Sequence, residues 1–117
     1  MKPNLKNKYL EKIQGIVFDA RPRLSSSSHQ LEFKNCFGAV AGYLDNQIFI
    51  TCGKFGLALR LPPKSLDKLF EQRGVKTLKY FKNGHIKKEY AVIPKYLLED
   101  KIGFKKLIDK SILFAKK

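Results

Sequence analysis

The chain has little of what marks secreted and membrane proteins. Its 117 residues include two cysteines, Cys36 and Cys52, which fit free thiols in a reducing cytoplasm. No apolar run approaches the ~20 residues that span a bilayer, and the first stretch, MKPNLKNKYLEKIQ, carries charges too often for a secretory signal. We therefore expect a cytoplasmic protein without a membrane partner, in which both thiols are buried as small hydrophobic groups.

Acidic residues and arginines are also scarce. The 24 lysines and arginines outnumber the 10 acidic residues, which leaves a formal net charge of +14, and 20 of those 24 residues are lysine. Such a charge attracts polyanions of any kind, because each neutralised phosphate releases a counterion. Lysine is a mobile point charge, whereas arginine makes the bidentate contacts that read guanine edges. The composition therefore favours loose electrostatic attraction over sequence-specific recognition.

Residue groups that catalyse reactions or hold metals are missing from the sequence. Zinc ligands come in pairs about two to five residues apart, but the four candidates here are 7, 16 and 33 residues apart: His29, Cys36, Cys52 and His85. A cysteine nucleophile needs an exposed thiol with a lowered pKa, and Cys52 is instead expected on an apolar strand face. The glycines lack the spacing of a phosphate-binding loop. The sequence therefore predicts no enzyme, no metal and no cofactor.

Aromatic and aliphatic residues, in contrast, are plentiful. Fourteen phenylalanines and tyrosines and a hydrophobic fraction of 44% are typical of one globular domain, here residues 1–117. A first helix is predicted over residues 4–20, with Asn4 as its N-cap. Its apolar face is expected at Leu5, Tyr9, Ile13 and either Ile16 or Val17. Pro22 ends this helix, and four consecutive serines make residues 21–30 a connecting loop.

Four strands and a helix are predicted in the middle of the chain. Apolar residues alternate with period two in four segments, at residues 31–37, 39–44, 47–52 and 57–61. Asp45 and Asn46 join two of these strands, because both tolerate the positive φ of a two-residue turn. The prolines at 62–63 start a helix that Gly74 is expected to cap. The buried stripe of that helix is expected at Leu66, Leu69 and Phe70.

Two more strands, at residues 77–82 and 85–93, and a final helix complete the prediction. Asp100 can cap that helix, whose inner face is expected at Phe104, Leu107, Ile108, Ser111 and Ile112. The order helix, four strands, helix, two strands, helix contains no repeated strand–helix–strand unit, and tight hairpins join antiparallel neighbours. The predicted fold class is α+β, with helices packed on one antiparallel sheet in two layers.

Three segments carry a resemblance to a known family: NCFGAVAGYLDNQIFITC, LALRLPP and IKKEYAVIP. Their order and spacing resemble the N-terminal domain of the TfoX/Sxy competence regulators, over about residues 30–117. The sequence departs from the family pattern where Cys36 and Ile48 replace methionine and Ala39 replaces a glycine. Each replacement is small or apolar, so the fold that the resemblance implies is unchanged.

The resemblance implies a two-layer α+β domain with no established chemistry. Full-length competence regulators carry a second, C-terminal domain, which we expect this protein to lack. We therefore interpret the chain as a stand-alone N-terminal domain, a non-enzymatic regulatory or adaptor module that acts through a protein partner. Competence-type transcriptional regulation and a homodimer are further expectations.

The lysine-rich stretch KYFKNGHIKKEY supplies an alternative function. Asn83 and Gly84 predict a two-residue turn, which sets Tyr80 opposite Lys87. Lysines on an exposed sheet edge prevent aggregation, but lysines around a tyrosine also suit a nucleic acid, whose bases stack on aromatic rings. Both interpretations stay open. The candidate residues for a nucleic acid or an acidic partner are Lys79, Tyr80, Lys82, Lys87, Lys88, Lys105 and Lys106.

Overall fold

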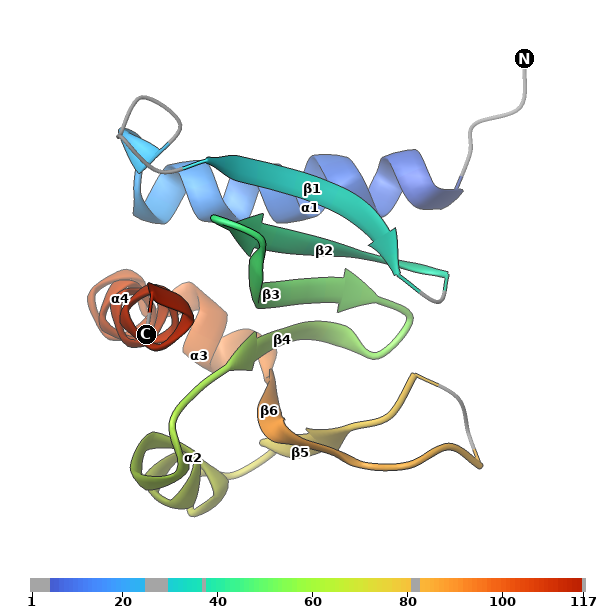
Figure 1. Cartoon of the computed structure of the whole chain (residues 1–117). Helices are drawn as coiled ribbons and strands as arrows, with labels where there is room; N and C mark the ends of the chain where they lie inside the picture. The colour runs from blue at the N-terminus through green and yellow to red at the C-terminus, as the bar shows by residue number, and fades with distance from the viewer. Residues whose placement is uncertain (1–4, 25–29, 37, 81–82, 117) are drawn as a thin grey trace.

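The computed structural model describes residues 5–24, 30–36, 38–80 and 83–116. Within these residues the chain forms four helices and six strands (Figure 1). The helices are α1 (Leu5–Ala20), α2 (Pro63–Phe70), α3 (Lys95–Glu99) and α4 (Lys101–Lys116). The strands are β1 (Leu31–Cys36), β2 (Ala39–Leu44), β3 (Gln47–Gly53), β4 (Gly56–Arg60), β5 (Lys76–Leu78) and β6 (Lys87–Ile93). The expected N-cap Asn4 and the four serines lie outside the described residues.

The strands form one antiparallel sheet in the order β1-β2-β3-β4-β6-β5. Figure 1 shows them stacked from β1 at the top to β5 at the bottom, with α2 beside the lower strands and α1 beside the upper ones. The predicted α+β class and the predicted order of elements are confirmed. The short helix α3, which directly precedes α4, was not expected.

Local signals set the turns and one helix start. Asp45 and Asn46 have φ values of 50° and 69°, the left-handed conformation that the sequence predicts for them. The carboxylate of Asp100 accepts a hydrogen bond from the Gly103 N–H at 3.2 Å, which confirms the predicted cap of α4. These residues fix where β2 turns into β3 and where the last helix begins.

The two faces of the sheet carry different cores. Leu57 and Leu59 of β4 belong to the main core, whereas Ala58 between them belongs to a smaller cluster with Leu78 and Val92 on the opposite face. All the helices contribute to the main core, through residues that include Ile13, Val17, Leu66, Leu69, Leu97, Ile108 and Ile112. The described helices therefore cover one face of the sheet.

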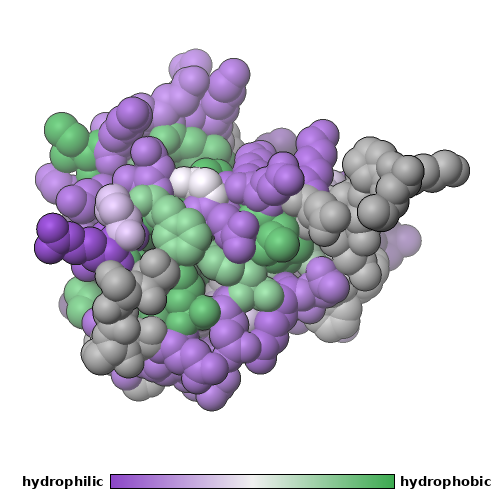
Figure 2. All heavy atoms as spheres, turned by 90° about the horizontal axis from the view of Figure 1, so that it is seen from above, coloured by the Kyte–Doolittle hydropathy of each residue, from purple (hydrophilic) through white to green (hydrophobic). Residues whose placement is uncertain are grey.

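Apolar side chains also reach the surface at the β1 end of the sheet. Figure 2 looks from above onto this end and shows hydrophobic atoms in the middle of the view, surrounded by hydrophilic ones. Phe18 of α1 and Phe33 of β1 are partly buried against the main core, and their rings meet edge-on with centroids 6.2 Å apart. The edge strand β1 thus lies beside an apolar surface.

Strand β3 has one residue more than β2 where the two strands pair. Tyr43 lies opposite Ile48 and Gly42 lies opposite Ile50, so Phe49 lies between two paired positions. This β-bulge interrupts the alternation of side chains. As a result, Phe49 and Ile50 are both fully buried in the main core, although they are consecutive.

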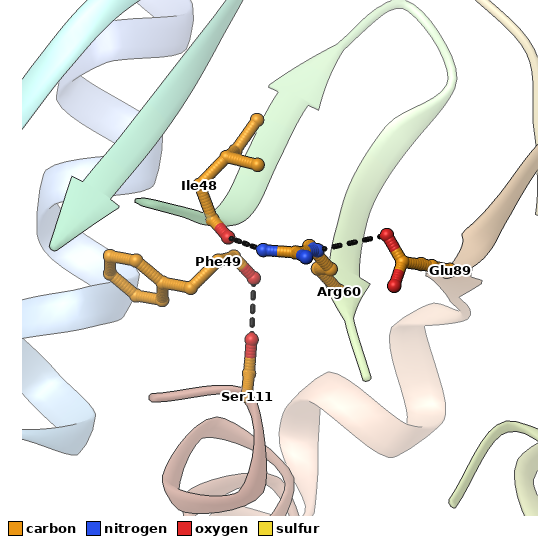
Figure 3. A network of polar contacts seen from close by, with 5 residues as sticks. All are labelled: Ile48, Phe49, Arg60, Glu89 and Ser111. Carbon is orange, nitrogen blue, oxygen red and sulfur yellow. Dashed lines mark hydrogen bonds and ion pairs between the residues drawn. The ribbon is translucent and has the colours of Figure 1, made fainter. Parts of the chain in front are cut away.

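Two side chains from other elements bond the carbonyl groups at this bulge (Figure 3). Arg60, at the end of β4, donates from Nη1 to the Ile48 carbonyl oxygen at 3.2 Å. Ser111 of α4 is fully buried and donates from Oγ to the Phe49 carbonyl oxygen at 2.5 Å. Because a buried carbonyl without a partner is costly, these two bonds stabilise the bulge.

The predicted register of the last hairpin is wrong. β5 ends at Leu78, so Leu78 rather than Tyr80 lies opposite Lys87. Leu78 is fully buried in a cluster with Ala58, and this packing sets the register of β5. Of the connection between β5 and β6 the structure describes residues 79–80 and 83–86, and none of these lies in a strand.

The predicted end of the middle helix is also wrong. α2 ends at Phe70, with Glu71 as its C-cap, and Gly74 lies in the turn beyond it with a φ of 82°. Leu66 and Leu69 are buried as expected, but Phe70 is 38% exposed. The buried stripe of α2 is therefore narrower than the sequence indicates.

Replacing Ser111 by alanine tests the bond at the bulge. Ser111→Ala leaves the buried Phe49 carbonyl without its donor, and we expect it to lower the free energy of unfolding by about 1–3 kcal/mol. Urea denaturation measures this change. Ser65→Ala on α2 is the matched control, with the same change in helix propensity and an expected effect within about 0.5 kcal/mol. Equal losses in the two variants would contradict the role assigned to the Ser111 hydroxyl.

Candidate functional site

The candidate lysines of the sequence fall into two separate groups. Lys79, Lys87 and Lys88 are exposed near the connection between β5 and β6, and Lys105 and Lys106 are exposed on α4. Figure 1 places that connection and α4 at opposite sides of the molecule. The structure therefore does not bring the two groups together, and Lys82 lies outside the described residues.

Tyr80 packs against the face of the sheet that the helices leave uncovered. Its ring meets Phe55 edge-on with centroids 5.6 Å apart, and its hydroxyl donates to Thr51 Oγ1 at 3.4 Å. The Lys87 ammonium lies 5.9 Å from the ring centroid. The tyrosine that the sequence offers as a stacking platform thus contributes to the smaller apolar cluster.

Arg60, in the segment LALRLPP, makes contacts that stabilise the fold. In addition to its bond at the bulge, its Nε lies 3.2 Å from Glu89 Oε1, and its guanidinium carbon lies 4.8 Å from the centroid of the Phe114 ring. Arg60 therefore connects β4 to β6 and to α4. With three contacts to its own chain, it is a weak candidate for binding a ligand.

The described residues offer little for catalysis or metal binding. Cys52 is fully buried in the main core, and this burial raises the pKa of its thiol, an effect that Lys12 partly opposes. His85 is exposed, while His29 and the side chain of Cys36 lie outside what the structure describes. No three His, Cys, Asp or Glu side chains of the described residues are grouped so that they could hold a metal ion.

A lysine-lined hollow separates α2 from α4. Its volume is about 310 Å³, and its lining residues are Lys64, Ser65, Lys68, Leu69, Gln72, Leu107 and Lys110. The α2 residues recur at helical spacing, so they share one side of that helix. Leu69 and Leu107 provide an apolar floor beneath the lysine side chains.

A second hollow continues along α4. Its volume is about 440 Å³, and its lining residues are Pro62, Lys110, Leu113, Phe114 and Lys116. Lys110 lines both hollows, so we treat them as one feature and call it the α2–α4 groove. Leu113 is 60% exposed, so it adds apolar surface to this hollow.

The α2–α4 groove has a single sign of charge. Four of its lining residues are exposed lysines, Lys64, Lys68, Lys110 and Lys116, and its lining residues include no carboxylate. A third hollow of about 380 Å³, between α1 and the start of α4, instead combines Asp19 with Lys101 and Lys105. The α2–α4 groove is therefore the described hollow best suited to a negatively charged ligand.

Sequence reasoning missed this groove. Its residues come from two helices, at positions 62–72 and 107–116, and no linear pattern shows that the two helices are neighbours. One signal was present in α2, where Lys64 and Lys68 are four residues apart and so lie on the same side of the helix.

The fold places the chain in a structural class, and its sequence places it in a known family. The chain is an α+β domain with helices on one face of a six-stranded antiparallel sheet, and none of its described helices is long and apolar enough to cross a membrane. Residues 23–115 match the family model of the TfoX N-terminal domain, so the chain belongs to this family. Neither the curated proteins nor the solved structures contain a match to the chain.

Thiol labelling tests the burial of Cys52. In a Cys36→Ser variant, which leaves Cys52 as the one thiol, we expect Ellman's reagent to react slowly with the folded protein and fully in urea. Burial raises the pKa of this thiol in the folded state, so above the ordinary thiol pKa unfolding releases a proton. The free energy of unfolding is therefore highest below the ordinary thiol pKa and decreases as the pH rises above it. Labelling of the folded protein at the rate of a free thiol would contradict this assignment.

Proposed function

We propose that this protein is a non-enzymatic regulatory module that binds an acidic, amphipathic helix of a partner protein in the α2–α4 groove. The observation that carries the proposal is the set of four lysines around an apolar floor, with no carboxylate among the lining residues. Membership of the TfoX N-terminal domain family supports a regulatory role, which we assign to the cytoplasm and to competence-type transcriptional regulation.

The spacing of the groove suits a helix. Leu107 and Phe114 are seven residues apart on α4, which is two helical turns or about 10 Å. A partner helix with apolar residues at the same interval can place one on each, in the way that amphipathic helices occupy hydrophobic grooves. The exposed Leu113 lines the second hollow with Phe114 and adds apolar surface there.

The charge of the groove selects among such helices. Lys64 and Lys68 lie on one side and Lys110 and Lys116 on the other, so acidic residues flanking the apolar stripe of a partner can meet lysines on both sides. Exposed ion pairs add only about 0.2–1 kcal/mol each. Their larger effects are to raise the rate of encounter and to disfavour basic partners.

A designed peptide tests the charge of the groove. The probe is a fluorescein-labelled helical peptide of about 18 residues, with leucine on one face and glutamate on the other. We expect Lys68→Glu/Lys110→Glu to weaken its binding at least about tenfold, as measured by fluorescence anisotropy, because two rim attractions become repulsions. The control Lys76→Glu/Lys88→Glu changes the net charge equally on β5 and β6, and we expect a small effect.

A second variant tests the apolar floor with the same peptide. Leu113→Ala removes exposed apolar surface, so we expect it to weaken binding of the peptide severalfold. Because Leu113 is exposed, the midpoint of urea unfolding is expected to stay the same. Equal losses in the groove variant and the control, together with no effect of Leu113→Ala, would mean that the peptide senses only the net charge.

A second candidate function is nucleic-acid binding through the exposed lysines beside the β5–β6 connection. It is favoured by Lys79, Lys87 and Lys88, which are all exposed, and by the net charge of +14. With a labelled single-stranded oligonucleotide, we expect affinity to fall as salt rises, with a logarithmic slope of about 0.7 per neutralised phosphate.

Alanine substitution separates this candidate from general attraction. Lys87→Ala/Lys88→Ala is expected to lower the salt slope by about one to two, whereas Lys64→Ala/Lys68→Ala in the groove is the matched control and is expected to leave it nearly unchanged. Absence of binding at low ionic strength, or equal effects of the two variants, would contradict a nucleic-acid site at this connection.

A further inference from the structure

Strand β1 forms one edge of the sheet, and among the described strands β2 alone lies beside it. The residue before it, Gln30, donates its N–H to the Asp45 carboxylate at 2.7 Å and accepts the Asp45 N–H at 2.8 Å, so its backbone faces β2. Successive residues of a strand direct their backbone groups to alternate sides. The N–H and C=O groups of Leu31, Phe33 and Asn35 therefore point away from β2.

These outward groups have no backbone partner within the part of the chain that the structure describes. An unpaired strand edge of this length readily accepts another strand. The opposite edge of the sheet is different, because β5 has three residues, of which Lys76 is the first, and Lys79 follows it. Because β5 offers only three residues for pairing, β1 is the edge better suited to self-association.

The charges of β1 are complementary to those of a second copy of the same strand. Glu32 and Lys34 lie on either side of Phe33, and their side chains share the face that the helices leave uncovered. If two copies of β1 pair antiparallel about a two-fold axis at Phe33, Glu32 lies opposite Lys34 of the partner subunit, and Lys34 lies opposite Glu32 of the partner subunit.

This arrangement also uses the outward backbone groups. Phe33 forms a hydrogen-bonded pair with Phe33 of the partner subunit, and Leu31 pairs with Asn35 of the partner subunit. The charged pairs then occupy non-hydrogen-bonded positions, where opposite side chains approach most closely. An axis at Leu31 or at Asn35 would pair fewer residues and would match neither charge.

The surface beside β1 is apolar, which favours its burial. Phe33 and Leu31 are partly buried against the main core, and Phe18 of α1 contacts Phe33 edge-on. Figure 2 shows hydrophobic atoms in the middle of this end of the molecule. Pairing of two β1 strands would remove part of this surface from water.

We propose that two copies of this chain form a homodimer by antiparallel pairing of their β1 strands about Phe33, which joins the two sheets into one. The occupant of the β1 edge is thus a second copy, because a self-complementary charge pattern about one residue is what a two-fold axis requires. This proposal is independent of the ligand of the α2–α4 groove.

Charge exchange across the axis tests the proposal. The mass of the full chain in solution is measured by sedimentation equilibrium, and we expect twice the 13.5 kDa of one chain. Glu32→Lys places lysines opposite lysines, and Lys34→Glu places glutamates opposite glutamates. Each substitution alone is expected to raise the dissociation constant at least about tenfold, because it changes two symmetric attractions into repulsions.

The combined variants make the test specific. The double variant Glu32→Lys/Lys34→Glu restores both attractions and is expected to dimerise as the wild type does. An equimolar mixture of the two single variants is expected to form a heterodimer, because one strand then carries two lysines and the other two glutamates. Circular dichroism confirms that each variant is folded, and Lys88→Glu is a control for the loss of one lysine.

Three outcomes would overturn the proposal. A wild-type protein that is monomeric at every concentration would leave the β1 edge to a strand of another protein. A dimer that Lys34→Glu weakens no more than Lys88→Glu does would use another surface. Failure of the mixed single variants to associate, with a wild-type dimer present, would exclude the two-fold axis at Phe33.

Discussion

The packing of α4 on the sheet depends on a β-bulge in β3, where side chains from other elements bond two backbone carbonyl groups. At this point the oxygens of Ile48 and Phe49 accept hydrogen bonds from side chains, Arg60 for the first and Ser111 for the second. Since an unsatisfied buried carbonyl costs about 1–3 kcal/mol, the bulge requires Ser111 at this position. Together with the buried Ile108 and Ile112, the Ser111 bond turns one side of α4 toward β3. Leu107 and Lys110 then lie on the side of α4 that lines the α2–α4 groove.

The sequence predicts features that depend on neighbouring residues and misses features that depend on distant ones. Asp45 and Asn46 tolerate a left-handed backbone wherever they occur, and Asp100 can cap a helix with groups three residues away, so both predictions are confirmed. The predicted register of the last hairpin is wrong because the burial of Leu78 beside Ala58 outweighs the turn preference of the residues that follow. Tertiary packing sets that register, and local turn chemistry does not.

The same distinction applies to the candidate sites. A run of lysines in the sequence suggests one binding surface. In the structure, however, the lysines near the β5–β6 connection and those of α4 lie on opposite sides of the molecule. The groove lysines, Lys68 and Lys110 among them, are far apart in sequence and meet only because α2 and α4 pack on the same face of the sheet. A net charge of +14 by itself says nothing about which of these arrangements the fold produces.

The two surfaces proposed here lie at different ends of the sheet, and this separation has a consequence for binding. β1 is the first strand of the sheet, whereas α2 packs on β6, the fifth strand in spatial order. With strands about 4.8 Å apart, joining two sheets at β1 would separate the two β6 strands by nine intervals, or roughly 40 Å. A dimer would then present two basic grooves far enough apart to engage two acidic helices at once. Bivalent binding of that kind strengthens an interaction whose individual ion pairs are weak. Dimerisation through β1 would therefore raise the overall affinity for a partner with two acidic helices above the affinity of one groove for one helix.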